Sequence, residues 1–243
     1  MNIDYLEDPP QSGVRNMAFD EALLESGRPV FRFYRWSEAT VSLGYFQHYA
    51  ERNDHAPSRF VPVVRRRSGG GAIVHDRELT YSLTLPHDSP LAAKRLALYE
   101  AVHRSFITVL GRFGIAAELH GTEQREKDAF LCFQRFRAND VVVRRNSGVV
   151  KILGSAQYRN GVGSVLQHGS LLLDRSVAAP ELEGMKQLAG TFPTVEELTD
   201  ALKLQLADDF FWNFQSFVST TLERTVAFLE ETRYSREGWT CKK

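Results

Sequence analysis

The first half of the chain contains short runs in which apolar and β-branched residues alternate with polar ones. Such runs favour strands, because one face of a strand packs on the core while the other meets solvent. We expect strands at residues 30–36 and 40–45, paired with each other across residues 37–39. Two further strands are expected at residues 60–66 and 78–85.

Helical spacing of apolar residues marks two segments, 13–26 and 91–113. Gly114 is a typical stop for the second helix. The face of that helix expected to be buried carries Leu96, Tyr99, Val102, Phe106, Val109, Leu110 and Phe113. Capping boxes begin at Thr194 and Thr220, so they predict helices running to about residue 210 and to about residue 231.

The second half of the chain returns to strand patterns. We expect a short strand at residues 116–120, a polar loop at 121–128, and a strand at 164–173. A hairpin is expected to join 139–143 to 149–153. Strands in the middle with helices before, between and after them predict the α+β class, a mixed β-sheet packed with helices. Residues 175–243 could form a helical tail.

Composition narrows the class of protein. Apolar residues make up 43% of the 243 residues and charged residues 25%, which is ordinary for a soluble globular protein. Thirty basic and thirty acidic residues give zero net charge, which argues against nucleic acid as a partner. The sequence contains no apolar stretch of membrane-spanning length, no signal-peptide pattern and only two cysteines. We therefore expect a cytoplasmic, reduced protein with no membrane partner.

Residues 65–76 (RRRSGGGAIVHD) are the most unusual stretch. Consecutive glycines allow a tight turn whose N–H groups can point at one anion. The three preceding arginines suit a carboxylate or a phosphate. The stretch therefore predicts a loop that binds a small anion or a polar carbonyl group. A surface hairpin with a solvated basic stem is the plainer alternative.

Cys132 and Lys151 each allow two interpretations. Cys132 has apolar neighbours and could be a small buried hydrophobe. The charged loop before it, together with Arg135 and Arg137, would instead favour a reactive thiolate. Lys151 lies in an apolar strand, where it could face solvent or present a fixed positive charge to an oxyanion.

His75 and His168 each follow an apolar run, and for His168 we expect a core histidine with satisfied nitrogens. No two histidines have metal-ligand spacing, so no structural metal is expected. The glycine patterns of P-loop and dinucleotide-binding folds are absent from the sequence.

The order of several segments resembles the lipoate/biotin protein ligase superfamily, and within it the cysteine-dependent octanoyltransferases and the lipoate-protein ligases. The similar segments are 16–22, 32–36, 41–47, 65–76, 79–82, 151–159, 166–171 and 234–240. Because these segments span nearly the whole chain, the resemblance implies one catalytic domain over residues 1–243. It also implies a mixed sheet with a curved tunnel for a medium-length acyl chain, whose mouth is formed by the glycine-rich turn and the strand of Lys151.

The resemblance leaves three activities open. A transferase would move an octanoyl group from octanoyl-acyl carrier protein to Cys132, and then to a lysine of a lipoyl domain or the glycine-cleavage H protein, with no cofactor. A ligase would instead activate lipoate with ATP and Mg²⁺. The third alternative is a non-catalytic protein that binds acyl groups or lipoyl domains.

Individual segments favour different activities. The position of Cys132 upstream of Lys151 and the segments 154–159 and 166–170 are similar to the transferases. The glycine pattern of residues 68–71 and the segment 138–140 are more similar to the ligases.

The resemblance also implies roles for particular residues. Cys132 would be the nucleophile, and Lys151 would favour its thiolate form and hold the thioester carbonyl. Backbone N–H groups of residues 70–73 would stabilise the oxyanion. The substrate-binding residues implied are Arg66, Ser68, Gly69, Gly70, Gly71, Ala72, Ile73, Val74, His75, Gly154, Ser155, Ala156 and Gly169.

Overall fold

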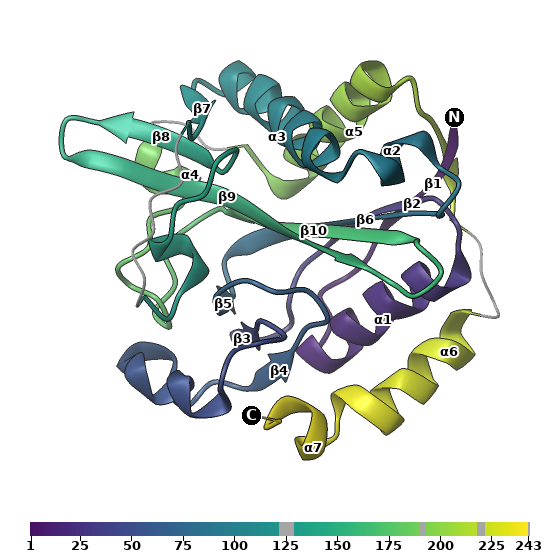
Figure 1. The fold of residues 1–243 in the computed structure, drawn as a ribbon. Coiled ribbons are helices and arrows are strands. Elements are labelled where there is room, and N and C mark those ends of the chain that lie inside the picture. The colour runs from purple at the N-terminus through teal and green to yellow at the C-terminus, as the bar shows by residue number, and fades with distance from the viewer. Residues whose placement is uncertain (122–128, 190–192, 218–221, 243) are drawn as a thin grey trace.

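An eight-stranded sheet runs through the centre of the computed structural model, which describes residues 1–121, 129–189, 193–217 and 222–242 (Figure 1). The strand order is β11-β1-β2-β6-β10-β9-β8-β7. β1 pairs in parallel with β2 and β11, and the other neighbours are antiparallel, so the sheet is mixed. Its strands are β1 (Asn2–Glu7), β2 (Val30–Tyr34), β6 (Glu78–Leu85), β7 (Ala117–Leu119), β8 (Val141–Arg145), β9 (Gly148–Arg159), β10 (Val165–Leu172) and β11 (Asn213–Ser216).

A second, three-stranded sheet lies beneath the first. It consists of β3 (Thr40–Leu43) between β4 (Val63–Arg65) and β5 (Ile73–His75). The expected pairing of residues 30–36 with 40–45 is therefore wrong. Both edges of β2 are occupied, by β1 and β6, so β3 pairs with β4 and β5 in the second sheet.

Helices cover both faces of the large sheet (Figure 1). The helices are α1 (Gly13–Ser26), α2 (Pro90–Ala93), α3 (Arg95–Arg112), α4 (Met185–Leu188), α5 (Val195–Phe210), α6 (Leu222–Leu229) and α7 (Glu237–Thr240). α3 and α5 share the main apolar core with the sheet, and α1 and α6 form a second core on the opposite side. The segment after residue 175 also contributes β11, which extends the large sheet beside β1.

Local capping interactions define several helix ends. Ser12 accepts a hydrogen bond from Arg15 N at the start of α1, and Gly27 ends that helix in the left-handed conformation with φ of 66°. Thr194 and Glu197 form the capping box of α5, with Glu197 N donating to Thr194 Oγ1 at 3.1 Å. The expected helices at 13–26 and from residue 195 are confirmed. The capping box expected from Thr220 and the expected loop at 121–128 fall largely outside the described residues.

The expected helix at 91–113 is divided at Lys94, whose φ and ψ of −108° and 57° are not helical. This break changes the direction of the first turn of α3, so Leu96 is 81% exposed instead of buried. The rest of the expected face is correct, since Val102 and Phe106 are fully buried. Phe106 packs edge-on against Phe33 of β2.

We expect Phe106→Ala to lower the free energy of unfolding by about 3–5 kcal/mol, because it leaves a cavity in the main core. Leu96→Ala on the same helix should change it by less than about 0.5 kcal/mol, because this side chain meets solvent. Urea denaturation followed by circular dichroism would measure both changes. Equal destabilisation by the two variants would contradict this orientation of α3.

Candidate active site

The glycine-rich loop between β4 and β5 contacts neighbouring backbone at two places, at Gly70 against Gly44 and at Gly71 against Cys132. Gly70 has φ of 96°, a conformation that favours glycine. A side chain at Gly44 would collide with Gly70 O, and one at Gly71 would lie 3.1 Å from the Cα of Cys132. The loop can therefore lie directly against the segment that carries Cys132 only because these residues are glycines.

Arg66 holds the loop from inside. Its guanidinium is buried and donates to Ser42 O at 2.7 Å, Gly69 O at 2.8 Å and Gly71 O at 2.7 Å. Burial lowers the pKa of Arg66 to about 10, so it remains a cation at neutral pH. Arg65 is likewise buried and donates to backbone carbonyls. Arg66 therefore orders the loop through its carbonyl groups, and the buried Arg65 and Arg66 do not form a solvated basic stem.

Cys132 is brought to the loop by backbone hydrogen bonds. Ala72 N donates to Phe130 O at 3.1 Å, and Cys132 N donates to Ala72 O at 2.7 Å. Lys151 of β9 reaches the same point, with its Nζ 3.8 Å from Cys132 Sγ and 3.3 Å from Cys132 O. The structure thus places the thiol, the ammonium group and the glycine loop together, although they are distant in sequence.

Asp140 is the nearest counter-charge of Lys151, and sequence reasoning did not identify it as a site residue. Its Oδ2 lies 2.7 Å from Lys151 Nζ, and both side chains are 2% exposed. Tyr99 of α3 donates to the other carboxylate oxygen at 2.9 Å, and Arg137 N donates to Oδ2 at 2.8 Å. Lys151 therefore sits beside Cys132 as half of a buried ion pair.

A second polar group lies beside this ion pair and is centred on Ser155 of β9. The Nδ1–H of His103 donates to Asn139 O at 2.6 Å, which leaves Nε2 to accept from the Ser155 hydroxyl at 2.6 Å. Tyr81 donates to the same hydroxyl oxygen at 2.7 Å. Burial lowers the pKa of His103 to about 4, so the ring is neutral. Sequence reasoning marked Ser155 but missed His103 and Tyr81, because their helix and strand patterns indicate only core positions.

His75 and His168 belong to two buried chains of hydrogen bonds. His168 Nδ1 donates to Asp20 at 3.2 Å, and its Nε2 accepts from Ser68 at 2.5 Å. The expectation that His168 is a core histidine with satisfied nitrogens is confirmed. His75 makes the same kind of chain with Glu78 and Ser42, and burial lowers the pKa of His75.

A narrow cavity lies where the loop, β9 and β10 meet, and its volume is about 20 Å³. That is room for about one water molecule. An acyl chain in the expected tunnel would require these side chains to move apart. The lining residues are Met17, Tyr34, Ser42, Arg66, Ile73, His75, Thr80, Ala156, His168, Gly169 and Ser170.

Of the predicted binding residues, this cavity is lined by Arg66, Ile73, His75, Ala156 and Gly169. Val74 is buried in the core of the small sheet with Val41 and Leu131, so it does not reach the cavity. Gly154 lies beside the Lys151 side chain, at a point where an added Cβ would be 2.6 Å from Lys151 Cε.

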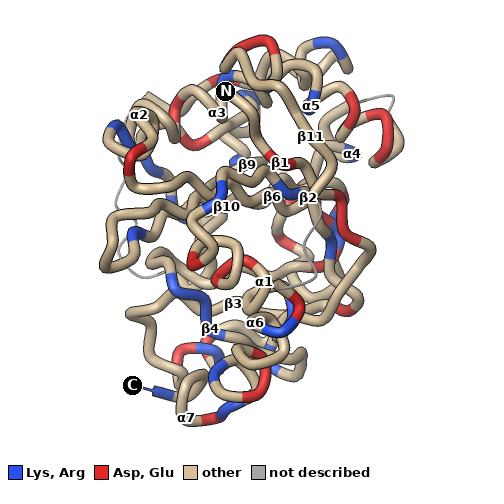
Figure 2. The backbone as a smooth tube through the Cα atoms, turned by 90° about the vertical axis from the view of Figure 1, so that its right-hand side faces the viewer, with Lys and Arg blue, Asp and Glu red and all other residues tan. Residues whose placement is uncertain are grey.

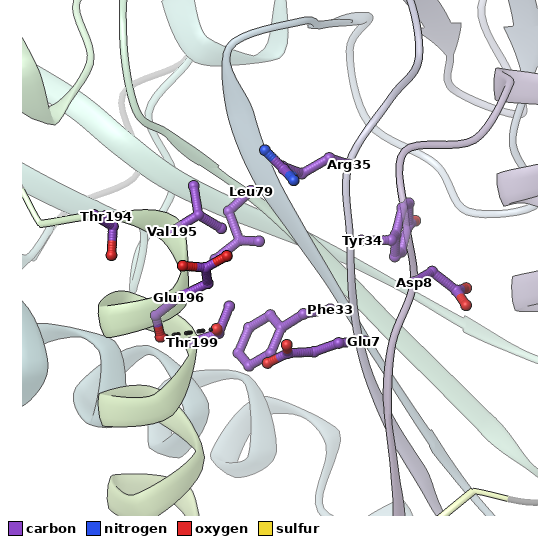
Figure 3. Close-up of a pocket in the computed structure, with 10 residues that line it drawn as sticks. All are labelled: Glu7, Asp8, Phe33, Tyr34, Arg35, Leu79, Thr194, Val195, Glu196 and Thr199. Atoms are coloured by element: carbon purple, nitrogen blue, oxygen red, sulfur yellow. Dashed lines mark hydrogen bonds between the residues drawn. The ribbon is translucent and has the colours of Figure 1, made fainter.

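A wider pocket of about 310 Å³ lies on another part of the large sheet (Figure 3). Glu7, Asp8 and Glu196 give it a largely acidic lining, with Arg35 on one side. It contains neither Cys132 nor any residue of the glycine loop, so it is not the candidate active site.

Comparisons with known proteins point to one family. Residues 12–203 match the model of the lipoyl protein ligase A/B catalytic domain. The chain belongs to this family. The fold expected from the resemblance is confirmed by solved members. A putative lipoate protein ligase from T. acidophilum has a TM-score of 0.81 at 22% identity over 100% of both chains. Lipoate-protein ligase A bound with ATP has a TM-score of 0.77 at 21% identity, over 99% of this chain and 98% of the other.

Curated relatives within the family are named octanoyltransferase LipM. The Clostridioides difficile protein is 36% identical over 68% of this chain, and the match covers 63% of that protein. The Carboxydothermus hydrogenoformans protein is also matched over 63% of its length. The Brevibacillus brevis protein is 31% identical over 98% of both chains. Within the part of the chain that the structure describes, no helix has both the length and the apolar character needed to cross a membrane.

We expect Asp140→Asn to lower the free energy of unfolding by about 3–5 kcal/mol, because it leaves Lys151 buried without its carboxylate. Asp140→Asn combined with Lys151→Met should recover at least half of that loss. Urea denaturation would give the coupling energy. As a control, Glu100→Gln breaks the exposed pair with Arg104 and should cost less than about 1 kcal/mol. A harmless Asp140→Asn would contradict a buried pair.

Stability should fall below neutral pH because of His103. The unfolded chain binds a proton near pH 6.5, whereas the folded chain binds it only near pH 4. The contribution of neutral His103 is therefore complete above pH 6.5 and is lost as the pH falls to 4, by roughly 3 kcal/mol. His103→Gln should remove this part of the pH dependence, and His87→Gln, at an exposed position, should retain it. Equal pH profiles for all three proteins would contradict the assignment.

Proposed function

We propose that this chain is an acyltransferase that moves an octanoyl group from octanoyl-acyl carrier protein to a lysine of a lipoyl-domain protein, such as the glycine-cleavage H protein. The observation that carries the proposal is the meeting of Cys132, Lys151 and the glycine loop at one point. The names of the curated relatives support it. We place the reaction in the cytoplasm, because both cysteines are unpaired and a reactive thiol needs reducing surroundings.

In the first half-reaction, the Cys132 thiolate attacks the carbonyl carbon of the donor thioester. A new C–S bond forms, and the carbonyl oxygen becomes an oxyanion. Gly70 and Gly71 can stabilise it, because their N–H groups donate to no acceptor within the described chain. The N–H of Ala72 already bonds Phe130 O, so the expected set of donors is smaller. Collapse of the intermediate breaks the donor C–S bond, and the released thiolate takes up the proton lost by Cys132.

In the second half-reaction, the neutral amine of the acceptor lysine attacks the Cys132 thioester. An amide bond forms, the C–S bond to Cys132 breaks, and the proton lost by the amine ends on the Cys132 sulfur. Lys151 lies 3.8 Å from that sulfur and stabilises the departing thiolate. Asp140 fixes the position of Lys151, which keeps its Nζ close to Cys132 through both half-reactions.

ATP-dependent ligation is the alternative within the family, and a fold neighbour was solved with ATP. The loop N–H groups could hold a phosphate here as well. However, Arg66 and Lys151 already donate to protein acceptors, and ligation gives Cys132 no role. The geometry therefore supports transfer over ligation.

Incubation with octanoyl-acyl carrier protein in the absence of ATP should add one octanoyl group to the protein, as measured by intact-mass spectrometry. Hydroxylamine should remove the group, because it cleaves thioesters. Cys132→Ala should gain no adduct, whereas Cys241→Ala, at the exposed cysteine, should gain it fully. An adduct on Cys132→Ala would overturn the mechanism. Acceptor acylation only from free octanoate with ATP and Mg²⁺ would make the protein a ligase.

A further inference from the structure

A groove of about 390 Å³ opens on the outer side of the glycine loop. Its lining includes three arginines and three aromatic side chains but no carboxylate. Acidic and basic residues are interspersed along the rest of the chain (Figure 2), and the net charge of the chain is zero. With three arginines and no carboxylate, the groove is therefore a local excess of positive charge. The lining residues are Tyr45, Phe46, Arg67, Gly69, Arg95, Gln157, Tyr158 and Arg159.

Two of the arginines are held on the same side of the groove by contacts between β9 and the α2–α3 junction. Gln157 Nε2 donates to Arg95 O at 2.8 Å, and Arg159 Nη2 donates to Ala92 O at 2.6 Å. Both arginines are exposed, and neither forms an ion pair within the described chain. Their positive charges are therefore free to meet an anion in the groove.

Arg67 closes the groove on the side of the loop. Its guanidinium lies 4.8 Å from the centre of the Tyr158 ring and donates to the Tyr158 hydroxyl. Glu21 lies 3.5 Å from its Nε and partly offsets its charge. The two exposed arginines thus carry most of the uncompensated charge, while Arg67 and Tyr158 form an ordered wall.

The groove and the candidate nucleophile contact the same glycine loop. Gly69 lines the groove, and Gly71, two residues further on, approaches the Cα of Cys132 so closely that an added Cβ would lie 3.1 Å from it. Phe46, which is 70% exposed, adds apolar surface to the lining. A ligand in the groove would therefore have one end beside the loop that faces Cys132.

We propose that this groove binds the phosphopantetheine arm of the thioester donor, with Arg95 and Arg159 on its phosphodiester and the aromatic residues along the rest of the arm. This inference rests on the proposed transferase function. Guanidinium groups bind phosphate by charge-assisted hydrogen bonds. The acceptor instead presents a lysine, whose ammonium form the arginines would repel. The charge of the groove therefore favours the donor over the acceptor.

The test compares two octanoyl donors. Octanoyl-acyl carrier protein carries the phosphodiester, whereas octanoyl-N-acetylcysteamine has the thioester without any phosphate. The rate of thioester formation on Cys132 is measured with each donor for the wild type, Arg95→Glu and Arg159→Glu. Arg224→Glu is the matched control, since it makes the same charge change at an exposed position of α6.

Each groove variant should lower the rate with the carrier protein about tenfold relative to the rate with the phosphate-free donor. Arg224→Glu should leave this ratio unchanged. Raising the ionic strength should lower the wild-type ratio towards that of the variants, because both arginines are exposed to screening ions.

Three results would overturn the inference. If the groove variants keep the wild-type ratio, the groove does not bind the phosphodiester. If they slow only the transfer from the octanoyl-enzyme to the lipoyl domain, the groove binds the acceptor. If the wild type forms no thioester with either donor, the transferase function fails, and the inference fails with it. The first two results leave the transferase function intact.

Discussion

The hydrogen bonds from Arg66 to the carbonyl oxygens of Gly69 and Gly71 set the direction of the whole site. In a trans peptide the carbonyl and the following N–H point in opposite directions. Carbonyls that turn inward to a buried guanidinium therefore send the next N–H groups outward. The N–H of Ala72 follows this rule and reaches Phe130 O, which draws in the segment of Cys132. One buried cation thus orients the N–H of Gly70 away from Arg66 and, through Ala72, holds the segment of Cys132.

Many polar side chains beneath the glycine loop are buried, and they are satisfied by hydrogen bonds to one another. The chains from Ser68 through His168 to Asp20, and from Ser42 through His75 to Glu78, satisfy their members in the interior. Such fully bonded networks specify one arrangement, because any displacement leaves a buried polar atom without a partner. The two networks therefore support the glycine loop from below, where the loop itself has few side chains to pack.

Much of the fold could be predicted from local patterns, because caps, hairpin signals and apolar periodicity act over a few residues. The α1 and α5 helices and the hairpin of β8 and β9 follow such signals. Pairings of distant strands could not be predicted in this way. β1 and β11 join from opposite ends of the chain, and β11 is short and polar, so neither strand was predicted.

The candidate site also has residues that the sequence indicates and residues that only the three-dimensional structure brings together. The glycine loop, Cys132 and Lys151 stand out in the sequence by composition and by resemblance. The ion pair of Lys151 with Asp140 does not, because it joins two strands whose pairing has a register shift between Val141 and Val142, next to Asp140. A bulge of this kind redirects side chains without a clear sequence signal. His103 was missed for a related reason, since a helix of core residues gives no sign that one of them bonds a serine on the sheet.

The narrowness of the cavity beside the loop also has a kinetic consequence. Under the proposed function, only molecules whose lining side chains have moved apart accept the acyl chain, so the apparent affinity is lowered by the fraction of molecules in that state. Opening of the cavity is then one of the steps of binding. The same opening would also admit water to the bound acyl chain. Substitutions that loosen the packing around the cavity would thus speed both loading of the acyl group and its loss by hydrolysis.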